Sequence, residues 1–116
     1  MSQDKPEESD RRSSERFVLP ADTPVYLEAV FNGAKVKLLV EDISTGGVLL
    51  MAPDICLSLN SGRVLHGVLM FPEGSAEVDA VVRWQLWPRV GVQFLAISRE
   101  SSASISKFFE SLRVRA

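Results

Sequence analysis

The chain has 116 residues, of which 46% are apolar and 24% are charged, a composition typical of one soluble globular domain. No apolar run is long enough to span a bilayer, the first residues lack the pattern of a secretory signal, and the single cysteine, Cys56, cannot form an internal disulfide. These features argue against a helical membrane protein and a disulfide-stapled secreted module, and they predict a cytoplasmic location without membrane insertion.

Charge is divided unevenly along the chain. Residues 1–10 carry four acidic side chains and one basic one, a net charge of −3, which leaves 12 basic and 11 acidic residues in 11–116. That remainder is nearly neutral, and its positive charge is concentrated locally at Arg11, Arg12 and Arg16. Because a duplex nucleic acid needs a broad basic surface, we expect no DNA or RNA partner, and a small anion fits the pattern better.

The first 19 residues show no strand or helix periodicity. Residues 1–10 are polar and acidic, and we expect them to form a flexible tail. The basic cluster follows on the segment 11–19, whose apolar end, 17–19, can attach to the core. Pro20 and Pro24 favour an extended or turning connection over a helix. A segment of this kind can close over a ligand.

Alternating apolar and polar residues predict six short strands between residues 24 and 96. Asn32-Gly33 is the strongest hairpin signal and separates the first two strands. The stretch 42–47 is expected to be a turn between the second and third strands. In the fifth strand, Trp84 is expected on the same side as Val78 and Val82. The predicted strands are 25–31, 35–41, 48–51, 64–71, 76–85 and 90–96.

The hydrophobic period changes after Ser98. Apolar residues then recur at helical spacing and predict an amphipathic helix over 99–113: Ile105, Phe108, Phe109 and Leu112. Six strands with regular turns and one closing helix predict an all-β fold, a small antiparallel barrel or sandwich with a C-terminal α-helix packed against it.

Two polar motifs flank the first strands. Arg12 and Arg16 form Arg-x-x-x-Arg, and residues 42–47 read Asp-x-Ser-x-x-Gly, with Asp42, Ser44 and Gly47. Guanidinium groups match phosphate oxygens and guanine O6 and N7, and a carboxylate can accept hydrogen bonds from guanine N1 and N2. Alone, the first motif is an ordinary solvated linker and the second an ordinary turn. Their ordered combination arises by chance much less often.

This combination resembles the signature of the PilZ domain family, the bacterial receptor module for cyclic di-GMP, and the likeness runs from about residue 11 to the end. Gly91-x-x-Phe94 also recurs in that family. The resemblance implies a single domain over 11–116, with an arginine switch segment at 11–19, a six-stranded barrel at 24–96 and a helix at 99–113 beside it. It further implies that both polar motifs bind the nucleotide.

The resemblance implies two more ligand contacts. Arg11 directly precedes Arg12, at a position that touches the ligand in the family, and an arginine there resembles members that bind an intercalated dimer of the nucleotide. Trp84 falls close to where the family places a residue beside the nucleotide. A tryptophan is more often a core residue, whereas stacking on a base would contribute about 1–3 kcal/mol.

Nothing in the sequence marks a catalytic or metal site. His66 and Cys56 are the only histidine and cysteine, so a zinc site and a Cys–His pair are both improbable. Ser44 lies in no Gly-x-Ser-x-Gly elbow, and no Walker phosphate loop is present. We therefore expect no enzyme activity, no metal and no cofactor apart from the nucleotide ligand.

Two functions follow from these observations. The first is a non-enzymatic cyclic di-GMP receptor, a monomer or weak homodimer, that relays binding to an unidentified downstream protein. The resemblance permits outputs such as motility, biofilm or surface polysaccharide, and virulence. The alternative is a nucleotide-independent adaptor of PilZ type that binds a protein partner constitutively. Relatives of that second kind lack both polar motifs, which this chain retains.

Overall fold

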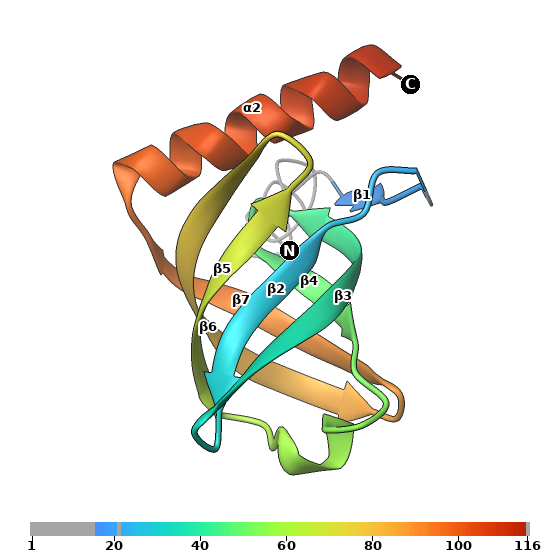
Figure 1. Cartoon of the computed structure of the whole chain (residues 1–116), viewed down its shortest axis with the longest axis vertical. Helices are drawn as coiled ribbons and strands as arrows, with labels where there is room; N and C mark the ends of the chain where they lie inside the picture. Colours follow the sequence, from blue (N-terminus) through green and yellow to red (C-terminus); the bar gives the residue numbers. More distant parts are fainter. Residues whose placement is uncertain (1–15, 21, 116) are drawn as a thin grey trace, which may run out of the picture.

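The computed structural model describes residues 16–20 and 22–115, so the predicted tail, Arg11 and Arg12 lie outside the described part of the chain. No helix in this part has both the length and the apolarity needed to cross a membrane. In chain order its elements are β1 (Arg16–Val18), β2 (Tyr26–Phe31), β3 (Ala34–Ser44), β4 (Gly47–Met51), η1 (Cys56–Ser58), β5 (Val64–Phe71), β6 (Gly74–Leu86), β7 (Arg89–Ile97) and α2 (Arg99–Arg115) (Figure 1).

Strands β2 to β7 form a closed six-stranded antiparallel barrel, which confirms the predicted fold class. The order around the ring is β3-β2-β5-β6-β7-β4, and the pairing of β4 with β3 closes it. Besides β4, strand β3 pairs with two other strands: residues 34–39 pair with β2, and residues 42–44 pair with β1. Strand β1 therefore occupies the part of β3 that β2 leaves unpaired.

The two hairpins at the ends of β3 differ from each other in their turns. Asn32 and Gly33 both have positive φ, 52° and 80°, as the predicted Asn-Gly hairpin requires. At the other end only Thr45 and Gly46 lie outside the strands. The expected turn over 42–47 is thus wrong in its extent, because β3 continues through Ser44.

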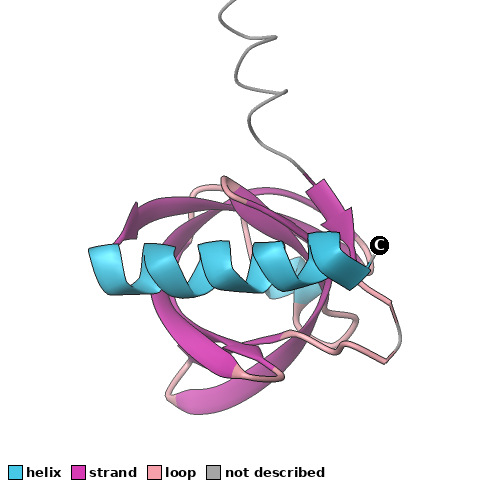
Figure 2. Cartoon of the chain, turned by 90° about the horizontal axis from the view of Figure 1, so that it is seen from above, coloured by secondary structure: helices cyan, strands magenta, loops and turns pink. Residues whose placement is uncertain are grey.

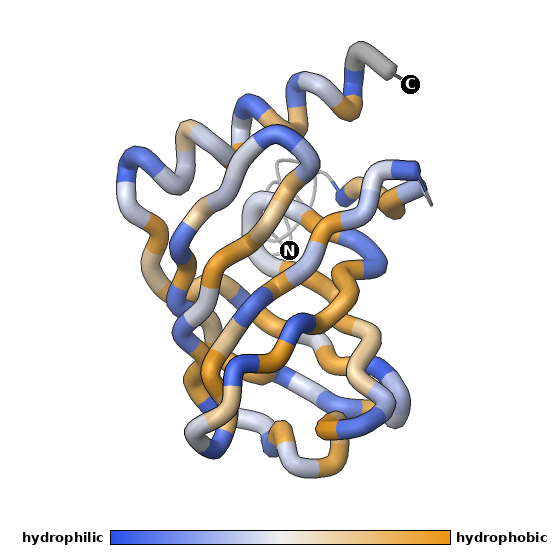
Figure 3. Tube along the Cα trace, in the orientation of Figure 1, coloured by the Kyte–Doolittle hydropathy of each residue, from blue (hydrophilic) through white to orange (hydrophobic). Residues whose placement is uncertain are grey.

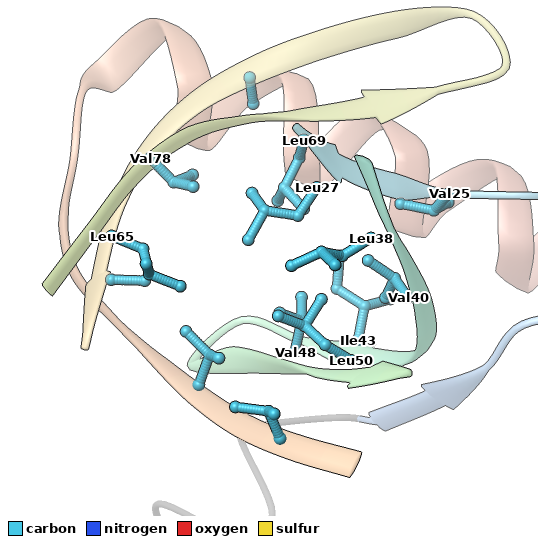
Figure 4. Packing of buried hydrophobic residues seen from close by; sticks show 14 of the residues in the cluster. Val25, Leu27, Leu38, Val40, Ile43, Val48, Leu50, Leu65, Leu69 and Val78 are labelled. Atoms are coloured by element: carbon cyan, nitrogen blue, oxygen red, sulfur yellow. The ribbon is translucent and has the colours of Figure 1, made fainter. Parts of the chain in front are cut away.

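The core lies inside the barrel and consists of the apolar residues that alternate along its strands. The alternation is visible along the chain trace (Figure 3). Val25, Leu27, Ile43, Leu50 and Leu69 point into the barrel and are at most 2% exposed (Figure 4). Burying a side chain of this size stabilises the fold by about 1.5–3 kcal/mol relative to leaving it in water.

Helix α2 lies across one open end of the barrel (Figure 2). Its start is capped by Ser98, whose Oγ accepts a hydrogen bond from the Ser101 N–H at 3.0 Å. Phe109 packs against Phe17 of β1, with ring centroids 5.1 Å apart. The helix therefore closes the barrel and also anchors the short first strand. All four apolar residues predicted for its inner face are buried: Ile105, Phe108, Phe109 and Leu112.

Replacing Phe109 by alanine should lower the free energy of unfolding by about 3–5 kcal/mol, because it opens a cavity under the helix. Urea denaturation followed by circular dichroism measures the change. Lys107→Ala is the matched control, since Lys107 is exposed on the same helix, and it should change stability by about 0.5 kcal/mol or less. Equal effects of the two substitutions would show that α2 does not contribute to the barrel core.

Candidate functional site

A cleft of 270 Å³ crosses the outer face of the barrel. Its floor is formed by β4 and β7, which are hydrogen-bonded neighbours. Strands β1 and β3 form one side, and β6 forms the other, so five elements contribute to one surface. The lining residues are Arg16, Ser44, Gly46, Gly47, Val48, Leu49, Arg83, Trp84, Gly91, Val92 and Gln93.

Arg16 and Asp42 join the two sequence motifs directly. In the β1–β3 register, Arg16 lies opposite Ser44 and Val18 lies opposite Asp42. The Arg16 Nη1 donates to Asp42 Oδ1 at 2.8 Å, although the residues are 26 positions apart. The Asp42 side chain is 13% exposed and that of Arg16 is 61% exposed. Arg16 thus belongs to a strand, rather than to a segment without secondary structure as expected from the sequence.

Asp42 itself borders a second, adjoining groove rather than the cleft. That groove lies between β1, β2 and β3 and shares Leu49 with the cleft. The ion pair with Arg16 therefore bridges the two depressions. Four of the predicted ligand residues in the described part of the chain line the cleft: Arg16, Ser44, Gly47 and Trp84. Asp42 does not line it but forms an ion pair with Arg16, which does.

Ser44 and Gly47 shape the end of the β3–β4 hairpin. The Ser44 Oγ accepts from the Gly46 N–H at 3.1 Å and donates to the Gly47 carbonyl at 3.4 Å. A Cβ on Gly47 would lie 2.1 Å from the Val92 carbonyl oxygen of β7. The missing side chain of Gly47 therefore lets β4 and β7 approach each other closely.

Trp84 lines the cleft because a β-bulge interrupts strand β6. Val82 pairs with Val92 and Trp84 pairs with Gly91, so Arg83 is the extra residue. The side chain of Trp84 is 46% exposed, and its predicted position on the same side as buried Val82 is wrong. The indole lies over Gly91, where a Cβ would be only 2.2 Å from its Nε1.

Arg83 and Gln93 were not identified as site residues from the sequence. The Arg83 Nε donates a hydrogen bond to the Gln93 Oε1 across the cleft wall. Strand alternation places Arg83 opposite to Trp84, and only the bulge brings both to one surface. A glycine within a strand, such as Gly91, indicates close packing at that point. The sequence gives no signal for the Arg83–Gln93 pair itself, which depends on the register between β6 and β7.

Cys56 and His66 lie outside this cleft. The thiol of Cys56 is buried and donates to the Arg89 carbonyl at 3.4 Å. His66 is exposed and its Nδ1 lies 2.6 Å from Asp79 Oδ1. Across residues 16–20 and 22–115, no group of three metal-ligating side chains comes together.

Comparison with known proteins gives one family and a set of similar folds. The family model described as the PilZ domain matches residues 10–111. The K. pneumonia MrkH–c-di-GMP complex is 28% identical with a TM-score of 0.78, covering 90% of this chain and 53% of that chain. The PilZ domain of YcgR from Escherichia coli with c-di-GMP is 18% identical with a TM-score of 0.68, covering 90% and 93%. At that identity, YcgR shows the fold alone.

The chain spans about half the length of the MrkH chains that it matches. One of these, 25% identical with a TM-score of 0.77, is described as a c-di-GMP dependence transcription regulatory factor. The expectation that no DNA is bound therefore gains no support from this relative. The comparison with curated proteins found no match.

The adjacent glycines 46 and 47 should respond very differently to alanine. Gly47→Ala places a Cβ against backbone of β7, and we expect a loss of stability of about 1–3 kcal/mol or more from this overpacking. Gly46→Ala is the control, since its Cβ would meet nothing nearer than Ser44 Oγ at 3.9 Å, and it should change stability by about 1 kcal/mol or less. Urea denaturation of both variants would contradict the packing role of Gly47 if the midpoints coincided.

Proposed function

The chain belongs to the PilZ domain family, and on this premise we propose that it is a non-enzymatic receptor for cyclic di-GMP. The observation that carries the proposal is a contact between one residue of each polar motif: Arg16, which lines the cleft with Ser44 and Gly47, forms an ion pair with Asp42. The similarity to MrkH, whose complex with c-di-GMP is solved, supports the choice of ligand.

Three residues in or beside the cleft, Arg16, Asp42 and Trp84, have chemical counterparts on the nucleotide. Cyclic di-GMP offers phosphates and guanine edges, and the guanidinium of Arg16 can donate to either. Asp42 can accept from the N1 and N2 hydrogens of guanine, which adenine does not present in the same pattern. Trp84 provides a half-exposed indole on which a base can stack. Arg11 and Arg12, outside the described residues, would complete the arginine set.

The proposed binding step exchanges partners at the Arg16–Asp42 ion pair. Water reaches this pair through Arg16, whose side chain is 61% exposed, whereas that of Asp42 is 13% exposed. Solvent-exposed ion pairs contribute about 0.2–1 kcal/mol, so we expect a modest cost for opening this one. The nucleotide would then give Asp42 a guanine edge and Arg16 a phosphate or base, both through charge-assisted hydrogen bonds. Fixing the side chains of Arg11, Arg12 and Arg16 against the ligand would cost conformational entropy, which these contacts must exceed.

The proposed signal is the altered surface around β1. When Arg16 leaves Asp42, both the charge and the shape change where the cleft meets the adjoining groove. A downstream protein that contacts this region would distinguish the two states, as in any two-state element biased by a ligand. Large exposed apolar residues elsewhere, Leu57, Leu86 and Trp87, offer further surface to a protein partner.

Cyclic di-GMP should raise the thermal unfolding midpoint of the protein. A ligand that binds only the folded state stabilises it by about 2.7 kcal/mol at about 100 times its Kd. Cyclic di-AMP is the control ligand and should give little or no shift. Adenine lacks the N1–H and N2–H groups of guanine, from which Asp42 would accept hydrogen bonds. If cyclic di-GMP also gives no shift at millimolar concentration, the nucleotide-independent adaptor becomes the better account.

Arg12→Ala and Arg16→Ala should each abolish or severely weaken nucleotide binding while leaving the fold intact. Loss of hydrogen bonds to a charged group lowers affinity by about 10- to 100-fold per residue. Isothermal titration calorimetry measures the affinity, and circular dichroism checks the fold. Arg99→Ala is the matched control, since Arg99 is an exposed arginine at the start of α2 that does not line the cleft. Unchanged affinity in both Arg12→Ala and Arg16→Ala would refute the assignment.

A further inference from the structure

Within residues 16–20 and 22–115, Arg83 has no anionic partner and no carboxylate lines the cleft that it borders. In the described part of the chain, Arg16 is paired with Asp42 and Arg89 with Glu41, whereas no carboxylate lies within ion-pair distance of Arg83. The described residues that line the cleft include two arginines and no acidic side chain. The charge of Arg83 is therefore available to an anionic ligand.

Gln93 holds the guanidinium of Arg83 without neutralising it. Its Oε1 accepts from the Arg83 Nε, and the donors on both terminal nitrogens of the guanidinium remain for a ligand. Gln93 is itself fixed in the middle of the sheet, because it pairs with Gly47 on β4 and with Val81 on β6. A neutral amide acceptor thus orients the arginine and keeps its full positive charge.

The bulge in β6 gives Arg83 a defined place next to the indole of Trp84. Both side chains line the cleft although they are consecutive in the sequence. Arg16 approaches the same cleft from β1, on the opposite side of the floor formed by β4 and β7. A nucleotide stacked on Trp84 would therefore lie between two guanidinium groups.

We propose that Arg83 binds a phosphate of the nucleotide, with Gln93 as the residue that positions it. The proposal rests on the proposed function and adds a contact that neither polar motif contains. A planar guanidinium beside a stacking platform suits a phosphodiester oxygen, and the absence of a competing carboxylate in the described lining strengthens that attraction.

Calorimetric titration of the full chain with cyclic di-GMP at low and moderate salt tests the role of Arg83. Arg83→Ala should lower the affinity by about 10- to 100-fold and reduce the dependence of affinity on salt. Arg83→Lys should retain much of the affinity, because a phosphate can accept hydrogen bonds from a lysine ammonium as well as from an arginine guanidinium. The control Arg99→Ala removes the same charge outside the cleft and should bind as the parent chain does.

Substitutions of Gln93 test whether it acts through Arg83. Gln93→Glu places a carboxylate against the Arg83 Nε, so it should weaken binding by neutralising the arginine. Gln93→Ala should weaken binding less, and it should have no further effect when Arg83 is already alanine. A purely structural role for Gln93 would instead lower affinity in both backgrounds.

The outcomes separate this proposal from the proposed function. If the parent chain binds and Arg83→Ala binds equally well, the role of Arg83 is refuted while the receptor function stands. If Arg83→Lys loses as much affinity as Arg83→Ala, Arg83 contacts the guanine edge and the phosphate assignment is wrong. If the parent chain itself does not bind, both proposals fail. Circular dichroism of each variant excludes unfolding, and the lysine and glutamate variants preserve side-chain bulk at both positions.

Discussion

The pairing of β1 with the end of β3 is the constraint on which the candidate site depends. Strand β2 stops pairing with β3 at Leu39, and β1 takes the free backbone groups beyond it. This places Arg16 beside Asp42, and Phe17 holds the strand down by packing on the helix. Three residues of strand could not form alone in water. They are ordered because a sheet edge, a salt bridge and an aromatic contact all act on the same short segment.

The cleft depends on two glycines of its floor, Gly47 on β4 and Gly91 on β7, because their missing side chains leave space for neighbouring groups. The Val92 carbonyl packs closely against Gly47, and the indole of Trp84 packs closely against Gly91. With any larger residue, the hairpin and β7 would separate, or the indole would lose its support. The same glycines that permit close packing therefore keep the floor low enough to leave a cleft above it. Close packing of the strands and an open cleft therefore both depend on this pair of glycines.

Sequence patterns predicted the barrel well because each strand buries one face, and burial imposes strict alternation on residues such as Leu27 and Leu50. They failed where geometry depends on partners far away in the chain. The β6 bulge reverses alternation at Arg83 and Trp84, and β1 forms only against β3. Of the candidate site, the motif residues could be predicted from the resemblance to the PilZ signature, whereas Gln93 and Arg83 required the register between β6 and β7.

Arg16 and Arg83, the two arginines that line the cleft, are restrained by different kinds of partner, and under the proposed function they would play different roles. Arg16 is held by a carboxylate, which fixes its position but also screens its charge. Arg83 is held by a neutral amide, which orients it while leaving its field unscreened. An anion entering the cleft would therefore be attracted first by the side of β6. If the anion then separated Arg16 from Asp42, the surface around β1 would change. The β6 wall of the cleft would thus attract the ligand, and the β1 wall would change on binding.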